Sequence, residues 1–261
     1  MDFFSMRIFL FLCILTSSLH AIFVGNPSFP HLYKNGLISS HPWVNLRVAY
    51  LYERITKGRY EDKFKSLSST PSFVKTISQF AIGTINISHI LDAYGGIGTS
   101  EMQLDNLIYA HNNFCWIAGG TITFFHYKRF SFGGDIKYFR TDQQANYFLL
   151  EQEVAPLVTP FKLIYEDIQG ALGLAYKTTY FSPYIGATYL YSTIEPKPRE
   201  GILRVPGTLD MVDFITQTAV TRRNWGMMLG TTLINSGKIS LNLEGRFFDL
   251  TGFNFSGNLR F

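Results

Sequence analysis

The sequence predicts an all-β fold, an antiparallel transmembrane barrel of the bacterial outer-membrane type. Two segments near the end of the chain, 238–248 and 253–261, alternate strictly between apolar and hydrophilic residues. A period of two indicates β-strand, because successive side chains point to opposite faces. The first residues have the pattern of an export signal, and no later apolar stretch is long enough for a membrane-spanning helix. Membrane residence then requires strands in a closed barrel, which satisfies every backbone polar group in lipid.

The two alternating segments each have one apolar face and one hydrophilic face. The apolar positions are Ile239, Leu241, Leu243, Gly245, Phe247, Phe253, Phe255, Gly257, Leu259 and Phe261. The hydrophilic positions are Ser240, Asn242, Glu244, Arg246, Asn254, Ser256, Asn258 and Arg260. In an outer-membrane barrel the first set meets lipid and the second meets a watery lumen. The aromatic Phe261 is typical of the last strand of such barrels, and we expect it to be the signal that the barrel assembly machinery recognises.

Residues 1–21 are expected to be a cleaved signal peptide, and residues 22–261 to be the barrel. Arg7 gives a basic start, 8–15 form an apolar run, and 17–21 provide a cleavage site. The apolar run is too short to span a bilayer as a helix. Cys13 lies within this run and is expected to be removed with it. The chain is therefore predicted to be exported to the bacterial outer membrane.

Composition restricts the classes of function. The formal net charge is only +4 and the chain has no block of Lys and Arg, so nucleic acid is not an expected partner. Cys115 is the only cysteine after the signal, so no internal disulfide can form. Aromatic residues make up 16% of the chain, which fits a barrel with aromatic girdles at its two lipid interfaces.

Eleven segments alternate clearly enough to be predicted as strands: 44–53, 73–86, 91–100, 114–126, 130–140, 164–176, 184–192, 211–221, 225–234, 238–248 and 253–261. The stretches 56–72, 101–113 and 195–210 are predicted as loops. Tight turns are expected near Ser88–His89 and at 127–129. Because bacterial barrels of this type have an even number of strands, we expect about 12, within a range of roughly 10–16. The missing strand would lie within 22–43, 101–112, 146–154 or 200–206.

The hydrophilic positions of these strands are the candidate lining of a lumen. They are Arg47, Glu53, Asp135, Lys137, Asp167, Gln169, Asn242, Glu244, Arg246, Asn254, Asn258 and Arg260. The Pro- and Gly-rich stretch that carries Arg199 and Arg204 is the best candidate for a loop folded into the lumen. Charges of both signs with a slight basic excess predict weak selectivity, tilted towards anions. Alternatively, these residues pair with one another inside a plugged barrel, because narrow barrels are filled by side chains.

Several blocks carry a resemblance to a known family. The longest is 165–176, which leads into 181–186. The last part of the chain adds Gly230, Lys238, Glu244, Arg246, Asp249 and 258–261, and shorter blocks lie at 24–27 and 81–98. Together they resemble the chlamydial major outer membrane protein family of porins, of which this chain looks like a short, divergent member. The resemblance implies an outer-membrane porin that passes small hydrophilic solutes and ions, and it suggests homotrimers.

The chain departs from that family in two respects. It is much shorter than a typical member, with the difference in the loops. It also has one mature cysteine where the typical member has several, which puts the family's disulfide cross-linking of the envelope in doubt. Cys115 is either a free or buried thiol or pairs with another chain.

Other classes of protein fit the sequence less well. A soluble β-sandwich also alternates, because one face packs on a second sheet. The export signal, Phe261 and the polar inner faces favour the barrel. An enzyme is not expected, because no Gly-x-Ser-x-Gly motif is present and no two histidines are spaced as a metal pair. Glu166 and Asp167 are adjacent on a strand and point to opposite faces.

The sequence therefore predicts passive diffusion of small hydrophilic solutes and ions across the outer membrane, with no cofactor, metal or catalytic residue. The alternative is a non-conducting structural or adhesive barrel whose loops meet a host surface or other envelope proteins. Conductance separates these two functions.

Overall fold

The computed structural model describes residues 26, 30, 44–62, 72–105, 108–145, 147–150, 153–156, 161–178, 180–198, 200–204, 211–215, 217–235 and 239–260. The expected signal peptide and Phe261 lie outside these residues. No helix among the described residues is long and apolar enough to cross a membrane.

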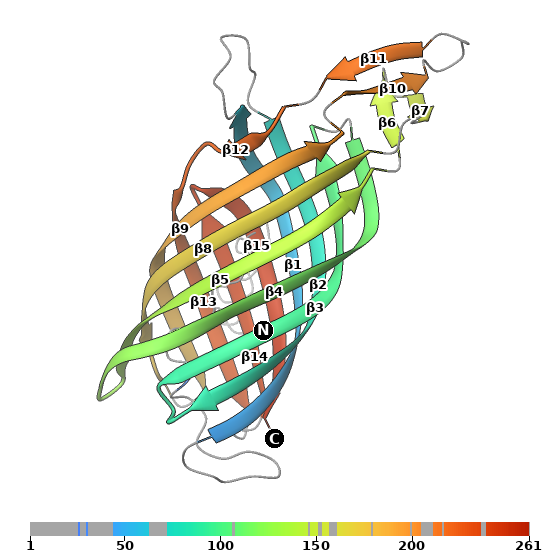
Figure 1. The fold of residues 1–261 in the computed structure, drawn as a ribbon. Helices are drawn as coiled ribbons and strands as arrows, with labels where there is room; N and C mark the ends of the chain where they lie inside the picture. Colours follow the sequence, from blue (N-terminus) through green and yellow to red (C-terminus); the bar gives the residue numbers. More distant parts are fainter. Residues whose placement is uncertain are drawn as a thin grey trace, which may run out of the picture.

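Ten long strands form a closed antiparallel barrel (Figure 1). They are β1 (Val44–Asp62), β2 (Ser72–Ile87), β3 (Leu91–Leu104), β4 (Ile108–Tyr127), β5 (Phe130–Gln144), β8 (Lys162–Tyr176), β9 (Phe181–Lys197), β13 (Trp225–Asn235), β14 (Ile239–Phe247) and β15 (Leu250–Arg260). Each pairs with the next long strand along the chain, and β15 pairs with β1 to close the ring. The fold class is therefore confirmed. Ten strands is the lower end of the predicted range, and the central value of twelve is too high.

The barrel has two ends with different connections. At one end, the turn end, β2–β3 and β4–β5 are joined by tight turns in which Ser88, His89 and Lys128 have positive φ. At the other, the loop end, β1–β2, β5–β8 and β9–β13 have longer connections, whereas β3–β4 and β14–β15 are joined by short ones. Both predicted tight turns are confirmed. Outer-membrane barrels have short periplasmic turns and longer extracellular loops, so we infer that the loop end is extracellular.

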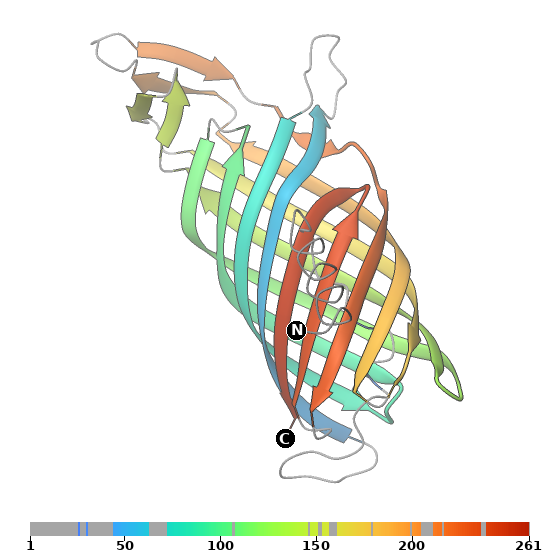
Figure 2. The same cartoon turned by 180° about the vertical axis from the view of Figure 1, so that it is seen from behind.

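Two hairpins lie at the loop end, outside the ring (Figures 1 and 2). β6 (Tyr147–Leu150) pairs with β7 (Glu153–Pro156), and β10 (Glu200–Arg204) pairs with β11 (Met211–Ile215). The predicted strand at 211–221 divides into β11 and a separate short strand. Strands of this length rise only about 13–17 Å and cannot cross a bilayer, which explains why the barrel has fewer strands than predicted.

A three-residue strand changes the width of the ring. β12 (Ala219–Thr221) pairs with β1 at Tyr60–Asp62 and with β9 at Thr193–Ile194. It fills the gap above β13, β14 and β15, which end lower on the wall than their neighbours (Figure 1). The ten-stranded ring therefore becomes an eight-stranded ring at the loop end, made of β1–β5, β8, β9 and β12.

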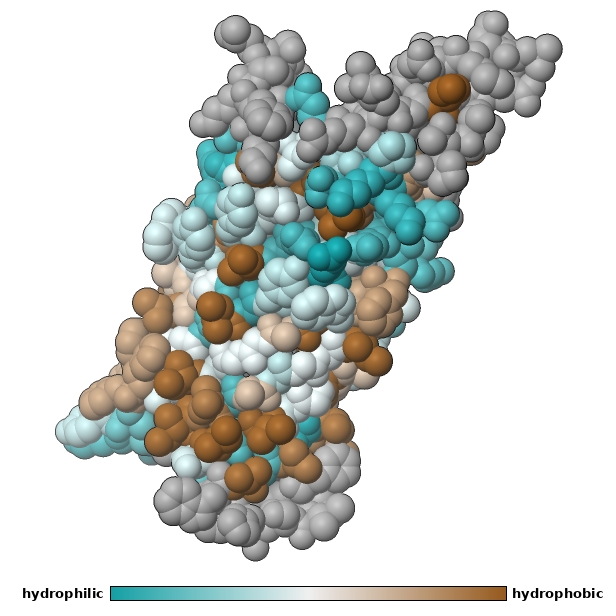
Figure 3. Space-filling view, viewed as in Figure 1, coloured by the Kyte–Doolittle hydropathy of each residue, from teal (hydrophilic) through white to brown (hydrophobic). Residues whose placement is uncertain are grey.

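The outer face of the wall changes character along the strands. On β5 the outward side chains are apolar from Phe130 to Ile136 and hydrophilic from Arg140 to Gln144. The Arg140 guanidinium bonds the Glu166 carboxylate across the β5–β8 pair at 2.7 Å, on the outside of the barrel. Figure 3 shows hydrophobic residues gathered on the lower part of this face and hydrophilic residues on the upper part. The upper barrel therefore stands clear of the apolar band.

Cysteine labelling tests the orientation of the barrel. Ile202→Cys places a thiol on β10 at the loop end, and Arg129→Cys places one in the β4–β5 turn. A membrane-impermeant maleimide added to intact cells is expected to label the first variant, and the second only after lysis. Cys115 is buried and adds little background. The opposite labelling pattern would reverse the assigned orientation.

Candidate functional site

The interior of the barrel is the candidate site, and at its loop end it is filled by apolar side chains. The Tyr60 hydroxyl on β1 lies 3.2 Å from the Tyr165 hydroxyl on β8, two strands that are not neighbours. Phe139 on β5 packs edge-on against Phe80 on β2 and against Tyr165, with ring centroids 5.8 and 5.4 Å apart. Leu51, Val74, Ile82, Met102, Ile108, Cys115, Ile117, Phe161, Leu163 and Ile194 belong to the same buried cluster. An eight-stranded ring is just wide enough for side chains to fill it, and this one is filled.

Cys115 lies within this aromatic cluster. Its position on β4 points inward, between the outward-facing Phe114 and Trp116, and the side chain is fully buried. A thiol enclosed by the barrel wall cannot reach a cysteine of another chain. An intermolecular disulfide at Cys115 therefore does not fit this fold, and Cys115 is a buried free thiol.

A layer of buried charges lies against the aromatic cluster. Arg246 donates from Nε to Asp249 Oδ2 at 2.9 Å, pairs with the same carboxylate again and bonds the Gln169 amide. The Thr188 hydroxyl donates to Asp249 Oδ2 at 3.0 Å. Arg246 and Asp249 lie at the β14–β15 turn and are fully buried. A buried ion pair is tolerated only when further hydrogen bonds complete it, and Gln169 and Thr188 supply them.

Other carboxylates in the wall accept hydrogen bonds from neighbouring strands. Asp135 accepts from the Thr121 hydroxyl at 2.7 Å and from the Tyr94 hydroxyl at 3.1 Å. Glu244 accepts from the Tyr184 hydroxyl at 2.8 Å. Each of these bonds joins side chains that face the interior, so the polar section of the lumen is cross-linked from strand to strand.

At the turn end, residues that precede the first strand enter this network. Asn26 is fully buried and donates to the Thr232 hydroxyl at 3.0 Å. The backbone carbonyl of Pro30 accepts from the Asn86 amide at 3.3 Å. Asn86 also donates to Asp92, whose carboxylate pairs with Arg47 at 2.8 Å. Asn26 and Pro30, which precede β1, therefore both contribute to the barrel interior.

Some interior polar atoms have no hydrogen-bond partner among the described residues. They include both amide atoms of Asn45 and of Asn254, Oε1 of Glu53 and Oδ1 of Asp167. Buried polar groups are usually satisfied by protein or by ordered water. The polar section is therefore less completely satisfied than the aromatic cluster, which makes it the section that water enters most readily. A cavity of about 30 Å³ lies there, between Arg47, Tyr94, Lys137 and Asn258.

Most of the sequence-predicted lumen residues do face the interior. Arg47, Glu53, Asp135, Lys137, Asp167, Gln169, Asn242, Glu244, Arg246, Asn254 and Asn258 are buried or half-buried on the inner face. The side chain of Arg260 lies outside the described set. Whether these residues line a conducting path stays a prediction.

The placement of Arg204 in the lumen is wrong. Arg204 ends β10, which pairs with β11 in a separate sheet beyond the barrel wall (Figure 1). Residues 200–204 and 211–215 satisfy one another's backbone groups there, so β10 does not fold into the lumen. Arg199 lies outside the described residues.

The balance of interior charge also differs from the prediction. The described interior holds six carboxylates, Glu53, Asp92, Asp135, Asp167, Glu244 and Asp249, against the cations Arg47, Lys137 and Arg246. The predicted tilt towards anions counted Arg204, which lies outside the wall, and Arg199 and Arg260, whose side chains are not described, and it omitted Asp92 and Asp249. Fixed acidic groups attract cations into a pore. No group of three or more metal-ligating side chains is found in the described part of the chain.

The residues that close the interior do not follow from the alternation pattern. Tyr60 lies in the stretch predicted as a loop, and Asp249 lies between the last two predicted strands. One signal was available for Tyr165, because it shares a strand face with Asp167 and Gln169 at spacings of two. Its contact with Tyr60 depends on the ring closing through β12, which no local pattern specifies.

No protein-family model and no curated protein matches the chain. Among solved structures it is similar to the outer membrane protease OmpT from Escherichia coli, with 8% identity and a TM-score of 0.40 over 83% of this chain and 94% of that one. It is also similar to the β domain of the Bordetella autotransporter BrkA, with 9% identity and a TM-score of 0.41 over 84% of this chain and 98% of that one. The transport unit of the autotransporter AIDA-I from Escherichia coli is 10% identical, with a TM-score of 0.34 over 90% of this chain and 95% of that one. These values support no transfer of activity.

The buried Arg246–Asp249 pair makes a prediction about stability. A Cβ at Gly226 would overlap the Asp249 carboxylate, whereas a Cβ at Gly83 meets no heavy atom within 4 Å. Gly226→Ala is therefore expected to lower the free energy of unfolding by about 1–3 kcal/mol, because it displaces a buried hydrogen-bonded charge. Gly83→Ala is the control and should leave it nearly unchanged. Urea unfolding in lipid vesicles, followed by tryptophan fluorescence, measures both, and equal effects would contradict the role given to Gly226.

Proposed function

We propose that this chain is an outer-membrane barrel whose filled lumen is closed to solutes, and that it has a structural or adhesive role at the cell surface. The single observation that supports this most is the filled eight-stranded ring, in which Tyr60, Phe139 and Tyr165 meet across the lumen. A bore that contains a packed apolar cluster does not pass hydrated ions, because an ion cannot shed its water there without compensation.

The loop end supports the adhesive part of the proposal. The hairpins β6–β7 and β10–β11 lie there beyond the ring, and their Val154 and Ile202 side chains are exposed. A hydrophilic part of the outer wall separates this end from the apolar band (Figure 3). Because these hairpins project above the lipid, their backbone edges and side chains are available for contact with other envelope proteins or with a host surface.

Passive diffusion is the second candidate, and the polar section of the lumen favours it. Charged side chains and incompletely satisfied polar atoms occupy the barrel next to the aromatic cluster. If the cluster separates, the path would favour cations, because acidic groups outnumber basic ones along it. The resemblance to chlamydial porins also supports this candidate. Export through the 1–21 signal, insertion by the barrel assembly machinery and trimer formation belong to both candidates.

Single-channel conductance decides between the two candidates. The refolded chain 22–261 in a planar bilayer is expected to show no stepwise current. Phe139→Ala with Tyr165→Ala removes two rings of the cluster and is expected to create steps, because the polar section then continues to the loop end. Phe132→Ala is the matched control, since Phe132 faces outward on the same strand with 40% of its surface exposed. Regular steps from the unmodified chain would overturn the closed-barrel proposal and establish the porin.

Ion selectivity of the opened variant tests the charge lining. With a salt gradient, its reversal potential is expected to indicate cation preference. Asp167→Asn should move that potential towards anions, because one acidic group leaves the path. Arg204→Glu should leave it unchanged, because β10 lies outside the wall. A shift caused by Arg204→Glu and none caused by Asp167→Asn would contradict the assigned lining.

A further inference from the structure

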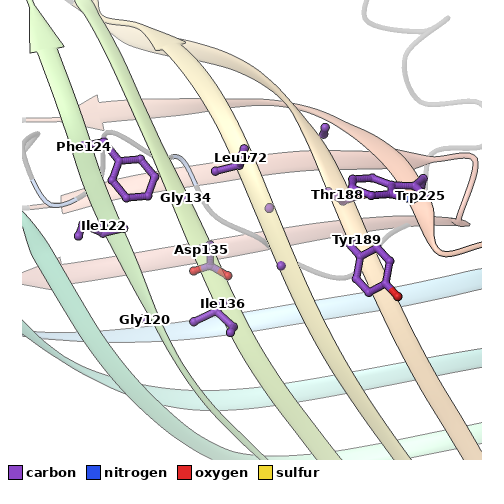
Figure 4. A pocket seen from close by; sticks show the side chains of 13 residues that line it. Gly120, Ile122, Phe124, Gly134, Asp135, Ile136, Leu172, Thr188, Tyr189 and Trp225 are labelled. Atoms are coloured by element: carbon purple, nitrogen blue, oxygen red, sulfur yellow. The ribbon is translucent and has the colours of Figure 1, made fainter.

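A groove of about 430 Å³ runs along the outer face of the barrel, over β4, β5, β8 and β9 and up to the start of β13 (Figure 4). Gly134, Gly170 and Ala187 form its floor, and Phe124, Tyr189 and Trp225 are among the large side chains along it. The outward-facing side chains here are exposed and apolar, including Ile136 and Leu172. The groove therefore lies in the part of the wall that faces lipid.

The registers of four strands create this groove. Gly170 lies between Ile136 on β5 and Tyr189 on β9, and Gly134 lies beside Leu172. Small and large residues thus alternate from strand to strand. Because glycine has no side chain, the wall is recessed at Gly134 and Gly170. A Cβ added at Gly170 would meet no heavy atom within 4 Å. The space over Gly170 is open, so a side chain placed there would enter the groove without disturbing the wall.

A pair of cations lies beside one end of the groove. Arg222 and Arg223 come just before Trp225 in the chain and are exposed. Two or three residues span roughly 10 Å at most, so both guanidinium groups are within reach of the Trp225 end. The backbone N–H of Arg222 donates to the carbonyl of Arg59 on β1, which fixes the backbone at this end of β12. In the described part of the chain, no ion pair joins Arg222 or Arg223 to an acidic residue.

We propose that this groove binds one acyl chain of an anionic, phosphate-bearing lipid of the outer leaflet, and that Arg222 and Arg223 hold its headgroup. Tyr189 and Trp225 lie between the apolar floor and the arginines, where aromatic side chains are favoured at a lipid interface. Cations next to an apolar surface at this level attract anionic headgroups. The site thus has an apolar part and a charged part, in the order in which the acyl chain and headgroup of such a lipid present them.

The arginines decide the specificity of this site. An acyl chain in the groove leaves an environment that is already apolar, so it gains packing contacts but little hydrophobic free energy. The discrimination between lipids must therefore come from the headgroup. A second copy of this chain fits less well, because a two-fold axis along the membrane normal would place the arginines of both copies at the same level, where like charges repel.

Quenching of Trp225 fluorescence by brominated lipid tests the proposal. Trp43→Phe with Trp116→Phe leaves Trp225 as the only tryptophan. In phosphatidylcholine vesicles, brominated phosphatidylglycerol is expected to quench Trp225 at a lower mole fraction than brominated phosphatidylcholine, by about fivefold for each arginine that contacts the headgroup. Arg222→Gln with Arg223→Gln should abolish this preference and leave quenching by phosphatidylcholine unchanged.

A second test fills the groove with a side chain. Gly170→Leu is expected to reduce quenching by both brominated lipids, because the leucine occupies the place of the acyl chain. Gly83→Leu is the matched control, since a Cβ at Gly83 also meets no heavy atom within 4 Å and this residue is not part of the groove. Equal quenching by both lipids, with no effect of Gly170→Leu, would overturn the proposal. Dimers that Gly170→Leu disrupts would also overturn it, in favour of a second copy as occupant. The proposal does not depend on whether the barrel conducts.

Discussion

Backbone hydrogen bonding in lipid is the constraint on which this structure depends. A strand with an unpaired edge cannot remain in the hydrocarbon region, so the sheet must close on itself. β1 and β15 meet that requirement along most of β1. Above the end of β15, the wall would open between β1 and β9 if nothing followed. The three residues of β12 pair with both edges and close it. A very short strand thus completes the closure of the whole barrel.

The filling of the interior is a consequence of this closure. Where β13, β14 and β15 take part, the ring has ten strands, and it contains charged side chains that form hydrogen bonds with side chains of other strands. Where β12 replaces them, the ring has eight strands and holds aromatic rings in contact. Closure through β12 narrows the ring there, and a narrower ring brings side chains of opposite walls, such as Tyr60 and Tyr165, within reach of each other. The width of the lumen therefore differs between its two ends.

The sequence predicts the faces of strands better than it predicts their lengths. β5, β8, β14 and β15 were assigned the correct inner and outer faces, because one apolar face must meet lipid and the alternation is strong. β1 was predicted to end at residue 53, yet it continues to Asp62. Beyond the lipid band its outward residues, such as Lys57 and Arg59, are as hydrophilic as a loop, so the period-two signal disappears while the hydrogen-bonded ladder continues. The same loss of contrast hid the upper ends of β3 and β4.

The short strands also fix how deep the barrel sits in the membrane. β13, β14 and β15 have 11, 9 and 11 residues, whereas β4 has 20. A tilted strand needs about 9–11 residues to cross the hydrocarbon core, so the first three have little length to spare. A thicker bilayer would cover part of β12 and the Arg222–Arg223 pair before it covered the other side of the barrel. Hydrophobic mismatch would then act on one sector of the wall, which gives the protein a preferred bilayer thickness and a direction in which it tilts.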